Sequence, residues 1–373
     1  YLRAKLLTGF PWLMPSIILS SNDYLIQIFA LVGSFTANLF VFSFSILPFI
    51  LIFNFRSKYI IFGLLSIPIT ILLFSSFVRL NNKDNKVSDK NLITLVQPNI
   101  EQKDKWNLEK RNANLNKLTQ FSIQNVNEYI GVNRIIIWPE TSFEGTIPNE
   151  MELLSVISKR ILTDQKAILV VGLLRVDKNK LFNSLVFLNS KGNIIHHYDK
   201  IHLVPFGEYI PLRNKFTTIA NFLSLKDFSS GNIKPNFTLK GFGNILTLIC
   251  YEILFTEEVI SRLSKNTNLL INITNDAWFG KTIGPYQHLA LAKIKAVELG
   301  IPLARVANTG ISALISPYGE EITKIPLYES GVRTAKLTLP LKNTIYRKYG
   351  EIIFIVSILF LIFINKMYNY KFS

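Results

Sequence analysis

The sequence predicts a layered α/β domain flanked by membrane-spanning helices, and two observations support this. Short runs rich in Ile, Leu and Val alternate with helical patterns between residues 92 and 319. Apolar runs lie before and after that region, and the chain as a whole is 49% hydrophobic with only 18% charged residues. So apolar a composition is unusual for a soluble domain, which indicates that the excess belongs in a membrane.

The middle of the chain has the pattern of one layered domain. Strands are predicted at 92–100, 134–140, 167–176, 184–190, 193–200, 244–252, 268–276, 302–308 and 311–319, and helices at 108–126, 152–163, 256–264 and 286–299. Several strand segments are apolar at nearly every position, which is typical of sheets covered on both faces. We therefore expect helices and sheets packed in layers around a core.

Two uncharged runs near the start, 25–53 and 59–78, reach the roughly 20 residues that a membrane span needs. Residues 352–364 form a shorter apolar run near the end. Residues 6–20 are apolar but contain two prolines, so they are either a kinked span or the end of one.

These runs predict three parts of the chain. Residues 1–80 form a transmembrane region of about three spans, 81–346 an extracytoplasmic domain, and 347–373 a C-terminal span with a short cytoplasmic tail. Because the chain begins with Tyr1 and not with Met, we expect further spans before it.

Basic residues near the spans indicate the orientation, since cytoplasmic loops carry an excess of Lys and Arg. If residues 6–20 cross the membrane, one side collects these basic residues: Arg3, Lys5, Arg56, Lys58, Lys366 and Lys371. That side is then cytoplasmic, and the middle domain is extracytoplasmic. Basic residues on the opposite side argue against this orientation: Lys83, Lys86, Lys90, Arg347 and Lys348.

The net charge of +16 fits either nucleic acid or an anionic membrane surface. The sequence has no zinc-finger spacing, no RNP-like aromatic motif and no basic region with heptads. We therefore expect a membrane and no nucleic acid as the partner.

Three ionisable residues end predicted strands: Glu140 in "RIIIWPE", Lys200 in "NIIHHYDK" and Cys250 in "NILTLIC". Ligands gather at the carboxyl ends of strands in such folds. A thiolate can attack a carbonyl, a carboxylate can take the thiol proton, and an ammonium can stabilise the oxyanion. Cys250, the single cysteine, is by itself more typical of a core residue, but the three residues together favour a nucleophile.

Four motifs in order resemble the nitrilase superfamily, also called the carbon-nitrogen hydrolases. They are "WPET" (138–141), "DKIHLVPFGEYIP" (199–211), "LICYE" (248–252) and the stretch 271–319 that begins "NITNDAWFGK". With the apolar spans and "TGFPW" (8–12), they are most similar to its membrane-bound branch, the apolipoprotein N-acyltransferases. The resemblance covers about residues 92–340 and implies an α-β-β-α sandwich.

The resemblance implies a Glu140, Lys200, Cys250 triad and a two-step acyl transfer. Cys250 would take a fatty acyl chain from a phospholipid as a thioester. The N-terminal amine of a diacylglyceryl-cysteine on an apolipoprotein would then accept that chain. The same resemblance implies a multi-pass protein of the bacterial inner membrane with its catalytic domain on the periplasmic side.

The resemblance also implies supporting residues. Glu208 in "PFGE" would support the site, and Tyr251 and Glu252 would shape the pocket. Trp106 matches a functional tryptophan of the family, although core packing or an interfacial anchor explains it equally well. One position departs from the family, because Lys295 stands where an arginine is usual, which would weaken the pinning of a glutamate.

Other functions fit the same residues. A membrane-tethered amidase or nitrilase would use this triad to hydrolyse a small C–N substrate, and an inactive scaffold would bind lipoproteins without a covalent intermediate. A transporter is disfavoured because the spans lack charges and paired broken helices. We expect a monomer.

We expect no cofactor and no metal. His196 and His197 point to opposite faces of a strand, so they cannot share an ion, and no zinc-ligand spacing is present.

Residues 212–242 are either a packed insert or a lid that enters the bilayer surface and admits acyl chains. Their apolar residues are Phe216, Phe222, Leu223, Leu225 and Phe228.

Overall fold

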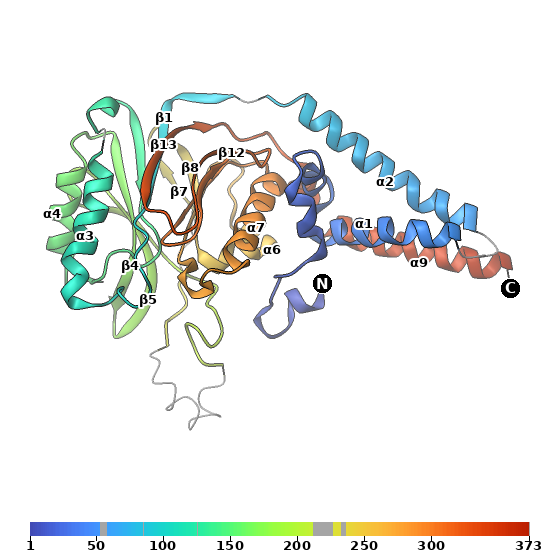
Figure 1. Cartoon of the computed structure of the whole chain (residues 1–373), viewed down its shortest axis with the longest axis horizontal. Coiled ribbons are helices and arrows are strands. Elements are labelled where there is room, and N and C mark those ends of the chain that lie inside the picture. Colours follow the sequence, from blue (N-terminus) through green and yellow to red (C-terminus); the bar gives the residue numbers. More distant parts are fainter. Residues whose placement is uncertain (53–57, 85, 125, 212–226, 233–235, 373) are drawn as a thin grey trace.

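The computed structural model describes residues 1–52, 58–84, 86–124, 126–211, 227–232 and 236–372. In this part of the chain two β-sheets lie face to face, and helices cover the outer face of each sheet (Figure 1). Three apolar helices extend from one end of the sandwich as an arm (Figure 1). The predicted α-β-β-α fold next to apolar helices is confirmed. Four apolar residues of the suggested lid, Phe216, Phe222, Leu223 and Leu225, lie outside the described residues.

The first sheet has the strand order β13-β1-β2-β4-β5-β6, with β3 paired to β4, and the second has the order β12-β11-β10-β9-β8-β7. The strands of the first sheet are β1 (Val87–Gln97), β2 (Asn133–Ile137), β3 (Thr146–Ile147), β4 (Ala167–Asp177), β5 (Lys180–Leu188), β6 (Ile194–Asp199) and β13 (Gly331–Thr338). Those of the second are β7 (Asn236–Leu239), β8 (Gly243–Ile249), β9 (Thr267–Thr274), β10 (Leu303–Ala307), β11 (Ser312–Ile315) and β12 (Glu321–Ile325).

The α-helices fall into two groups. The sandwich carries α3 (Leu108–Ile123), α4 (Met151–Ile161), α6 (Thr256–Arg262), α7 (Gly284–Leu299) and α8 (Ile345–Tyr349). The arm consists of α1 (Ile28–Ile52), α2 (Lys58–Asn81) and α9 (Ile352–Phe372).

Central strands are parallel in both sheets, so their carboxyl ends share an edge. In the first sheet β1, β2 and β4 are parallel, and in the second β8, β9 and β10 are. Alternate side chains fill the space between the sheets, such as Ile135 and Ile137 opposite Ile271 and Ile273. The intervening Ile136 packs with the cluster under α3 and α4 instead. This alternation explains strands that are apolar at every position.

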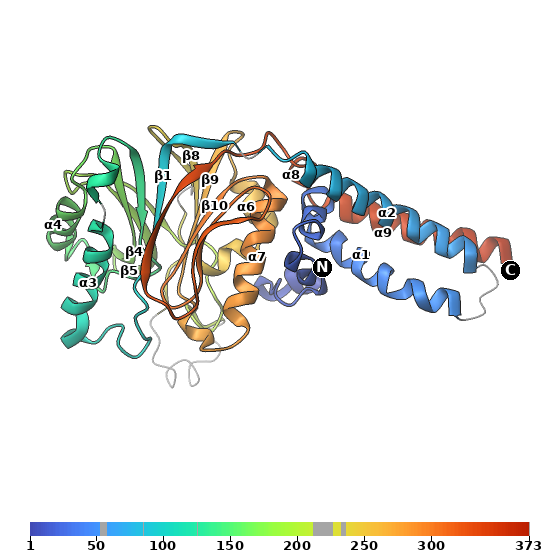
Figure 2. The ribbon, with the colours of Figure 1, turned by 45° about the horizontal axis from the view of Figure 1, so that its top comes forward.

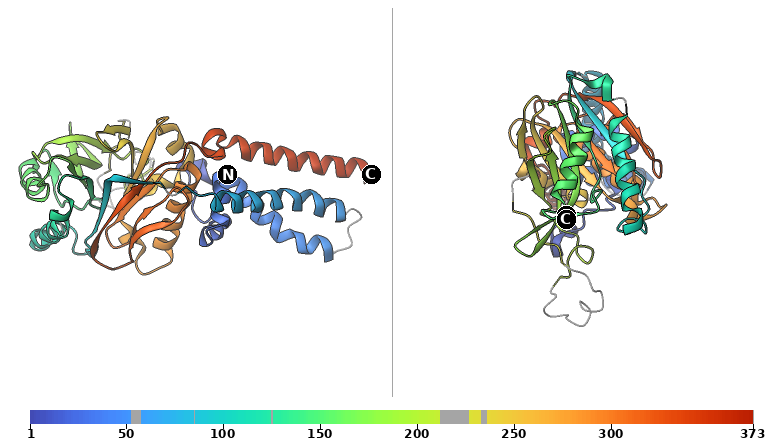
Figure 3. Two further views of the ribbon diagram at one scale, coloured as in Figure 1. Left: turned by 90° about the horizontal axis from the view of Figure 1, so that it is seen from above. Right: turned by 90° about the vertical axis from the view of Figure 1, so that its left-hand side faces the viewer.

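The arm contains the predicted apolar runs. Leu25–Ile52 and Ile61–Asn81 are long and apolar enough to cross a membrane, and Ile352–Phe363 is a shorter apolar helix. Figures 2 and 3 show that α1 and α2 run side by side and that the C-terminal end of α1, the start of α2 and the chain's C-terminus lie at the far end of the arm. Along the arm, Phe74 of α2 and Leu359 of α9 are mostly exposed, as side chains that face lipid would be.

Residues 6–20, expected to be a kinked span or the end of one, form no continuous helix. Short 3₁₀ helices at Leu6–Thr8 and Pro15–Ser21 are separated by a stretch that contains Pro11. The prolines and the left-handed Gly9, with φ of 83°, explain the interruption.

The same segment packs against the sandwich. The Trp12 indole donates to Gln287 of α7 at 2.7 Å, and Lys5 pairs with Glu257 of α6. Arg3 and Lys5 therefore lie with the sandwich and not at the far end of the arm, which removes one of the basic groups from the predicted cytoplasmic side.

A buried polar cluster joins the arm to the sandwich. Lys295 of α7 lies 2.6 Å from Glu298, and its ammonium also donates to Thr256 of α6. Ser34 of α1 donates to the other oxygen of Glu298 at 2.5 Å. Glu298 is fully buried, so its charge depends on these partners. The lysine at this position thus does pin a glutamate, without the fork of an arginine.

Replacement of Lys295 by Met should destabilise the chain by about 3–5 kcal/mol, because it leaves the buried charge of Glu298 without its counter-ion. Thermal unfolding of the detergent-solubilised protein measures this loss. Lys293→Met is the matched control on the same helix, since its partly exposed pair with Glu321 at 3.4 Å is expected to contribute about 0–1 kcal/mol. Equal melting temperatures for the two variants would contradict the prediction, and Lys295→Arg should retain most of the stability.

Candidate active site

Cys250 is the first residue after β8 and begins a short 3₁₀ helix, Cys250–Leu254. Its backbone is left-handed, with φ of 52°, a conformation that costs a residue other than glycine about 1–3 kcal/mol. Such strain persists only where surrounding contacts maintain it. The residue is partly exposed, so a substrate can reach it.

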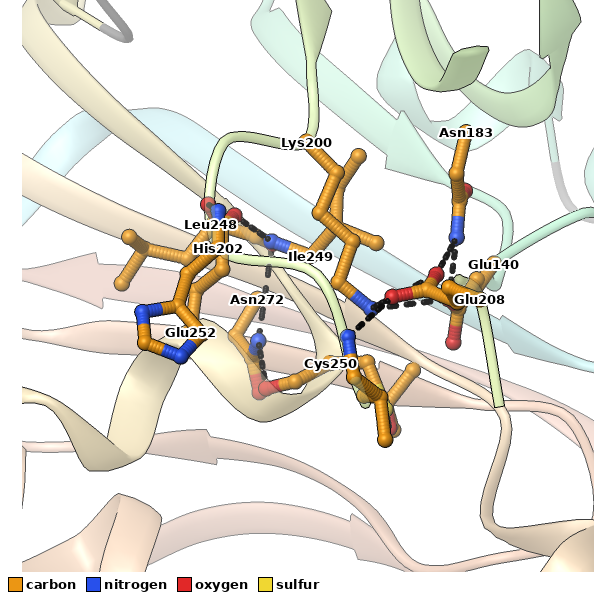
Figure 4. A network of polar contacts seen from close by, with 12 residues as sticks. Glu140, Asn183, Lys200, His202, Glu208, Leu248, Ile249, Cys250, Glu252 and Asn272 are labelled. Carbon is orange, nitrogen blue, oxygen red and sulfur yellow. Dashed lines mark hydrogen bonds and ion pairs between the residues drawn. The ribbon is translucent and has the colours of Figure 1, made fainter. Parts of the chain in front are cut away.

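The buried carboxylate of Glu252 maintains that turn. Its hydrogen-bond partners come from both sheets and a helix: Ile249 N at 2.8 Å, Tyr198 Oη at 2.6 Å, Ile201 N at 3.0 Å, His202 N at 3.1 Å and Arg262 Nη1 at 3.0 Å. Figure 4 shows Ile249 and His202 beside it. Because Tyr198 belongs to β6 and Ile249 to β8, this carboxylate ties the two sheets together beside Cys250.

Glu140, Lys200 and Glu208 form one buried cluster at the strand ends (Figure 4). The Lys200 ammonium lies 2.9 Å from the Glu208 carboxylate and 3.8 Å from that of Glu140. The Asn183 amide donates to both carboxylates, at 2.7 Å to Glu140 and 2.9 Å to Glu208. The backbone N–H of Val204 donates to the second oxygen of Glu208 at 2.8 Å. Lys200 is therefore held between two oriented carboxylates.

The strands fix the backbone positions of Glu140 and Lys200. Glu140 follows β2 after Pro139, and Lys200 follows β6, where its N–H donates to the Asn183 carbonyl at 2.8 Å. Gly172 of β4 lies so close that a Cβ there would be 2.4 Å from the Pro139 carbonyl. Only glycine permits this approach, which sets the depth of Glu140 in the sandwich.

The thiol is neutral at rest and the lysine is charged. Burial raises the pKa of Cys250 to about 12; the charge of Glu140 adds to this effect and that of Lys200 opposes it. Burial alone would lower the pKa of Lys200, but the carboxylates of Glu208 and Glu140 raise it above its ordinary value. Attack by sulfur therefore needs a base for the thiol proton.

A second buried network lies behind the sulfur. The Thr274 hydroxyl is 3.2 Å from Cys250 Sγ and 3.2 Å from Asp276 Oδ1, so its one proton can serve either atom. Asp276 also contacts His288 at 2.9 Å and Arg305 at 2.7 Å. Burial disfavours the charge of Asp276, but Arg305 and His288 lower its pKa to about 2. The carboxylate is thus ionised and rigidly held.

The structure brings most of the predicted residues together. Lys200 pairs with both Glu140 and Glu208, and the charges of Glu140 and Lys200 act on Cys250. Tyr251 points elsewhere, since its hydroxyl donates to the Gly9 carbonyl at 3.1 Å. This bond ties the nucleophile's turn to the N-terminal segment.

Trp106 is not part of the buried cluster. Its side chain is 46% exposed and its backbone is left-handed, with φ of 81°. The residue before it, Lys105, is buried and donates to the Glu140 carbonyl at 3.0 Å. The exposure of Trp106 argues against core packing.

Sequence reasoning missed several residues of the site. Asn183 sits inside an apolar strand, and no pattern marks it. Thr274 and Asp276 lie at the end of a predicted strand, which is the signal that could have found them. Lys105 lies in a polar stretch that resembles an ordinary surface loop, so its burial is visible only in the structure.

Comparison with known proteins identifies the family of the chain. Residues 92–345 match the model of the carbon-nitrogen hydrolase family. The apolipoprotein N-acyltransferase of Rhodopseudomonas palustris is 30% identical in an alignment 386 residues long, which covers 98% of this chain and 71% of that protein. The one of Rickettsia prowazekii is 32% identical in an alignment 393 residues long, which covers 100% of this chain and 75% of that protein.

Solved structures support the fold. An amidase from Nesterenkonia sp. aligns with a TM-score of 0.50 at 20% identity, over 70% of this chain and 94% of its own. Nit3 of Saccharomyces cerevisiae, a member of the nitrilase superfamily, aligns with a TM-score of 0.51 at 19% identity, over 68% of this chain and 91% of its own. The sandwich fold is therefore shared with these two structures, whereas the N-acyltransferases match the helical arm as well. The chain belongs to the carbon-nitrogen hydrolase family and, within it, to the apolipoprotein N-acyltransferases.

Proposed function

We propose that the chain transfers a fatty acyl group from a phospholipid to the N-terminal amine of a diacylglyceryl-cysteine on an apolipoprotein, through a thioester on Cys250. The observation that carries this proposal is the convergence of Glu140, Lys200 and Cys250 beside an apolar arm. The named relatives that match nearly the whole chain support the same activity.

In the first step Glu140 is the base. Its carboxylate takes the proton of Cys250 as the sulfur attacks the ester carbonyl, because the free thiol holds its proton at neutral pH. The Lys200 ammonium stabilises the negative charge that develops on the carbonyl oxygen. The ester C–O bond breaks, and the proton on Glu140 passes to the departing lysophospholipid.

In the second step the acceptor amine attacks the thioester carbonyl. Glu140 takes a proton from the nitrogen, the C–S bond breaks, and the thiolate regains a proton. The products are an amide on the lipoprotein and the free thiol of Cys250. Because Glu140 is the base in both steps, the rate of the whole reaction depends above all on the position of its carboxylate relative to the Cys250 sulfur.

The supporting residues have separate roles in this proposal. Glu208 orients Lys200, and Glu252 maintains the strained turn of Cys250. Tyr251 holds the N-terminal segment at the site. Trp106 is exposed and follows the buried Lys105, so we place it where substrate enters.

An apolar cavity beside the nucleophile fits an acyl chain. Its volume is about 450 Å³, and its lining includes Leu6, Leu7, Phe10, Val204 and Tyr251. Val204 belongs to the loop after Lys200, and Tyr251 follows Cys250 directly. The relatives that match nearly the whole chain are N-acyltransferases, so the amidase alternative is not favoured.

We further propose a multi-pass chain of the bacterial inner membrane with the sandwich on the periplasmic side. The far end of the arm carries Lys58 at the start of α2 and Lys366 near the end of α9. These basic residues suit a cytoplasmic location. Others, such as Lys83 and Lys348, lie near the sandwich and oppose it, so the proposal rests on the likeness to the N-acyltransferases. A monomer suffices, because the described site draws its residues from one chain.

The thioester is the decisive test of this function. Purified protein incubated with phospholipid should gain the mass of one fatty acyl group, and hydroxylamine should remove it. Since Cys250 is the only cysteine, Cys250→Ser protein should gain no hydroxylamine-sensitive mass. Acylation of that variant to the same extent would sink the proposed nucleophile. Release of the acyl group to water, with none on a diacylated lipopeptide, would favour the hydrolase.

Replacement of Glu140 by Gln should slow thioester formation by about 10²–10⁴-fold, the usual contribution of a positioned base. The measurement is the rate of acyl-enzyme formation from a fluorescent phospholipid. Glu152→Gln, on the exposed surface of α4, is the control and should keep the wild-type rate. An unchanged rate in the Glu140 variant would remove this residue from the mechanism.

The reactivity of Cys250 should rise with pH from 7 to 10 without levelling off, because the pKa of its thiol is raised to about 12. Alkylation of the lipid-free protein by iodoacetamide measures this profile, and mass spectrometry counts the modified cysteine. A plateau above about pH 8.5, the ordinary range of a cysteine, would show that the resting thiol is not perturbed as described.

A further inference from the structure

Lys105 is a buried cation next to the proposed base, and the reaction described above does not use it. Its side chain belongs to the loop between β1 and α3 and is only 4% exposed. Its ammonium donates to the backbone carbonyl of Glu140 at 3.0 Å. Among the described residues this is its one hydrogen-bond partner, although an ammonium has three protons to donate.

The loop that carries Lys105 is fixed to the strand ends around the site. The Asn275 amide donates to Gln102 at 3.0 Å, and the backbone N–H of Ile100 donates to Asn308 at 3.1 Å. Asn275 follows β9 and Asn308 follows β10, so the loop is attached to the second sheet. Its lysine reaches Glu140, which follows β2 of the first sheet. The loop therefore bridges both halves of the sandwich at the active site.

The charges around Lys200 require a second cation. Lys200 carries one positive charge between the carboxylates of Glu140 and Glu208, which leaves this cluster one negative charge in excess. Transfer of the thiol proton to Glu140 moves that negative charge to Cys250 and does not remove it. A buried negative charge without a counter-ion is costly, so the thiolate needs further positive charge nearby.

Lys105 lies where it can supply that charge. The charged or titratable groups that act on it are Glu140, Glu144 and Cys250, and all of them favour its protonated form. Glu144 itself is 6% exposed, and one of its oxygens accepts from the Asn114 amide at 2.7 Å. Burial is the larger effect and lowers the pKa of Lys105 to about 8, so the ammonium form still prevails at pH 7.

A purely structural role explains this residue poorly. A single hydrogen bond to a carbonyl could come from a neutral amide, which is far less costly to bury than an ammonium. The carbonyl that Lys105 binds belongs to the residue that we propose as the base. Its hydrogen bond is therefore directed at the proposed base, and its charge faces Glu140 and Cys250 as well as Glu144.

We infer that Lys105 is a positioning residue, which fixes Glu140 through its main chain and supplies the second positive charge that the Cys250 thiolate needs. This inference rests on the proposed roles of Glu140 and Cys250. It adds that the triad depends on a fourth charged group, contributed by a loop before the first of its members.

The test is alkylation of Cys250 by iodoacetamide between pH 6 and 10, in detergent and without lipid. Lys105→Met removes the charge and keeps the length of the side chain, and Lys105→Arg keeps the charge. Lys103→Met is the matched control, because Lys103 lies in the same loop with its side chain 75% exposed and paired to Glu101. Melting temperatures of all variants establish that they are folded.

We expect Lys105→Met to slow alkylation about tenfold below pH 8, which corresponds to a rise of about one unit in the pKa of the thiol. The difference should shrink above pH 8, where the wild-type lysine itself loses its proton. Lys105→Arg should stay within about threefold of the wild type, and Lys103→Met should not differ from it.

A folded Lys105→Met protein with the wild-type profile would overturn the inference. An equal loss of alkylation rate in Lys105→Met and Lys105→Arg at every pH would also overturn it, because such a loss would come from altered packing and not from the missing charge. If Lys105→Met does not fold, Lys105→Gln takes its place. A slower alkylation of folded Lys105→Gln below pH 8, with a smaller difference above pH 8, supports the inference. A decrease in the alkylation rate that is the same at every pH overturns it. Since no lipid is present, these outcomes do not depend on whether the protein transfers acyl groups.

Discussion

The carboxylate of Glu252 is the contact on which the active-site architecture depends. It binds the end of β8, the end of β6 and the loop that follows β6, and it pairs with Arg262 of α6. These bonds offset the left-handed backbone of Cys250 and hold the sulfur at the junction of the two sheets. Without these bonds, nothing would fix the position of the Cys250 thiol, on the second sheet, relative to Glu140 and Lys200 on the first.

Charge compensation is the second constraint on the site. Lys200 lies between two carboxylates whose orientation Asn183 fixes by donating to both. The thiol is protonated at rest, so the carboxylates of Glu140 and Glu208 carry the negative charge of the site until a substrate arrives. A protonated Cys250 reacts slowly with adventitious electrophiles, and in the proposed reaction its activation depends on proton transfer to Glu140.

The apolar arm is coupled to this chemistry by polar contacts. Ser34 of α1 binds the buried Glu298, and Tyr251, next to the nucleophile, binds the segment that leads into the arm. The cavity beside Tyr251 has one wall from that segment and one from the loop after Lys200. A substrate with a long apolar chain would therefore meet the arm and the catalytic groups together, which fits a donor that never leaves the bilayer.

The sequence by itself determined the layered α/β class, nearly all central strands and helices, and the three strand-end residues Glu140, Lys200 and Cys250, because periodicity and strand ends are local properties. It did not reveal the edge strands β7, β12 and β13, whose mixed residues lack an apolar run, nor that residues 6–20 pack on the sandwich. Only the tertiary structure decided that Asn183 and Lys105 join the site, since their environments come from segments distant in the chain. Burial turns an ordinary loop lysine into a charge beside the base, and no local pattern encodes burial of that kind.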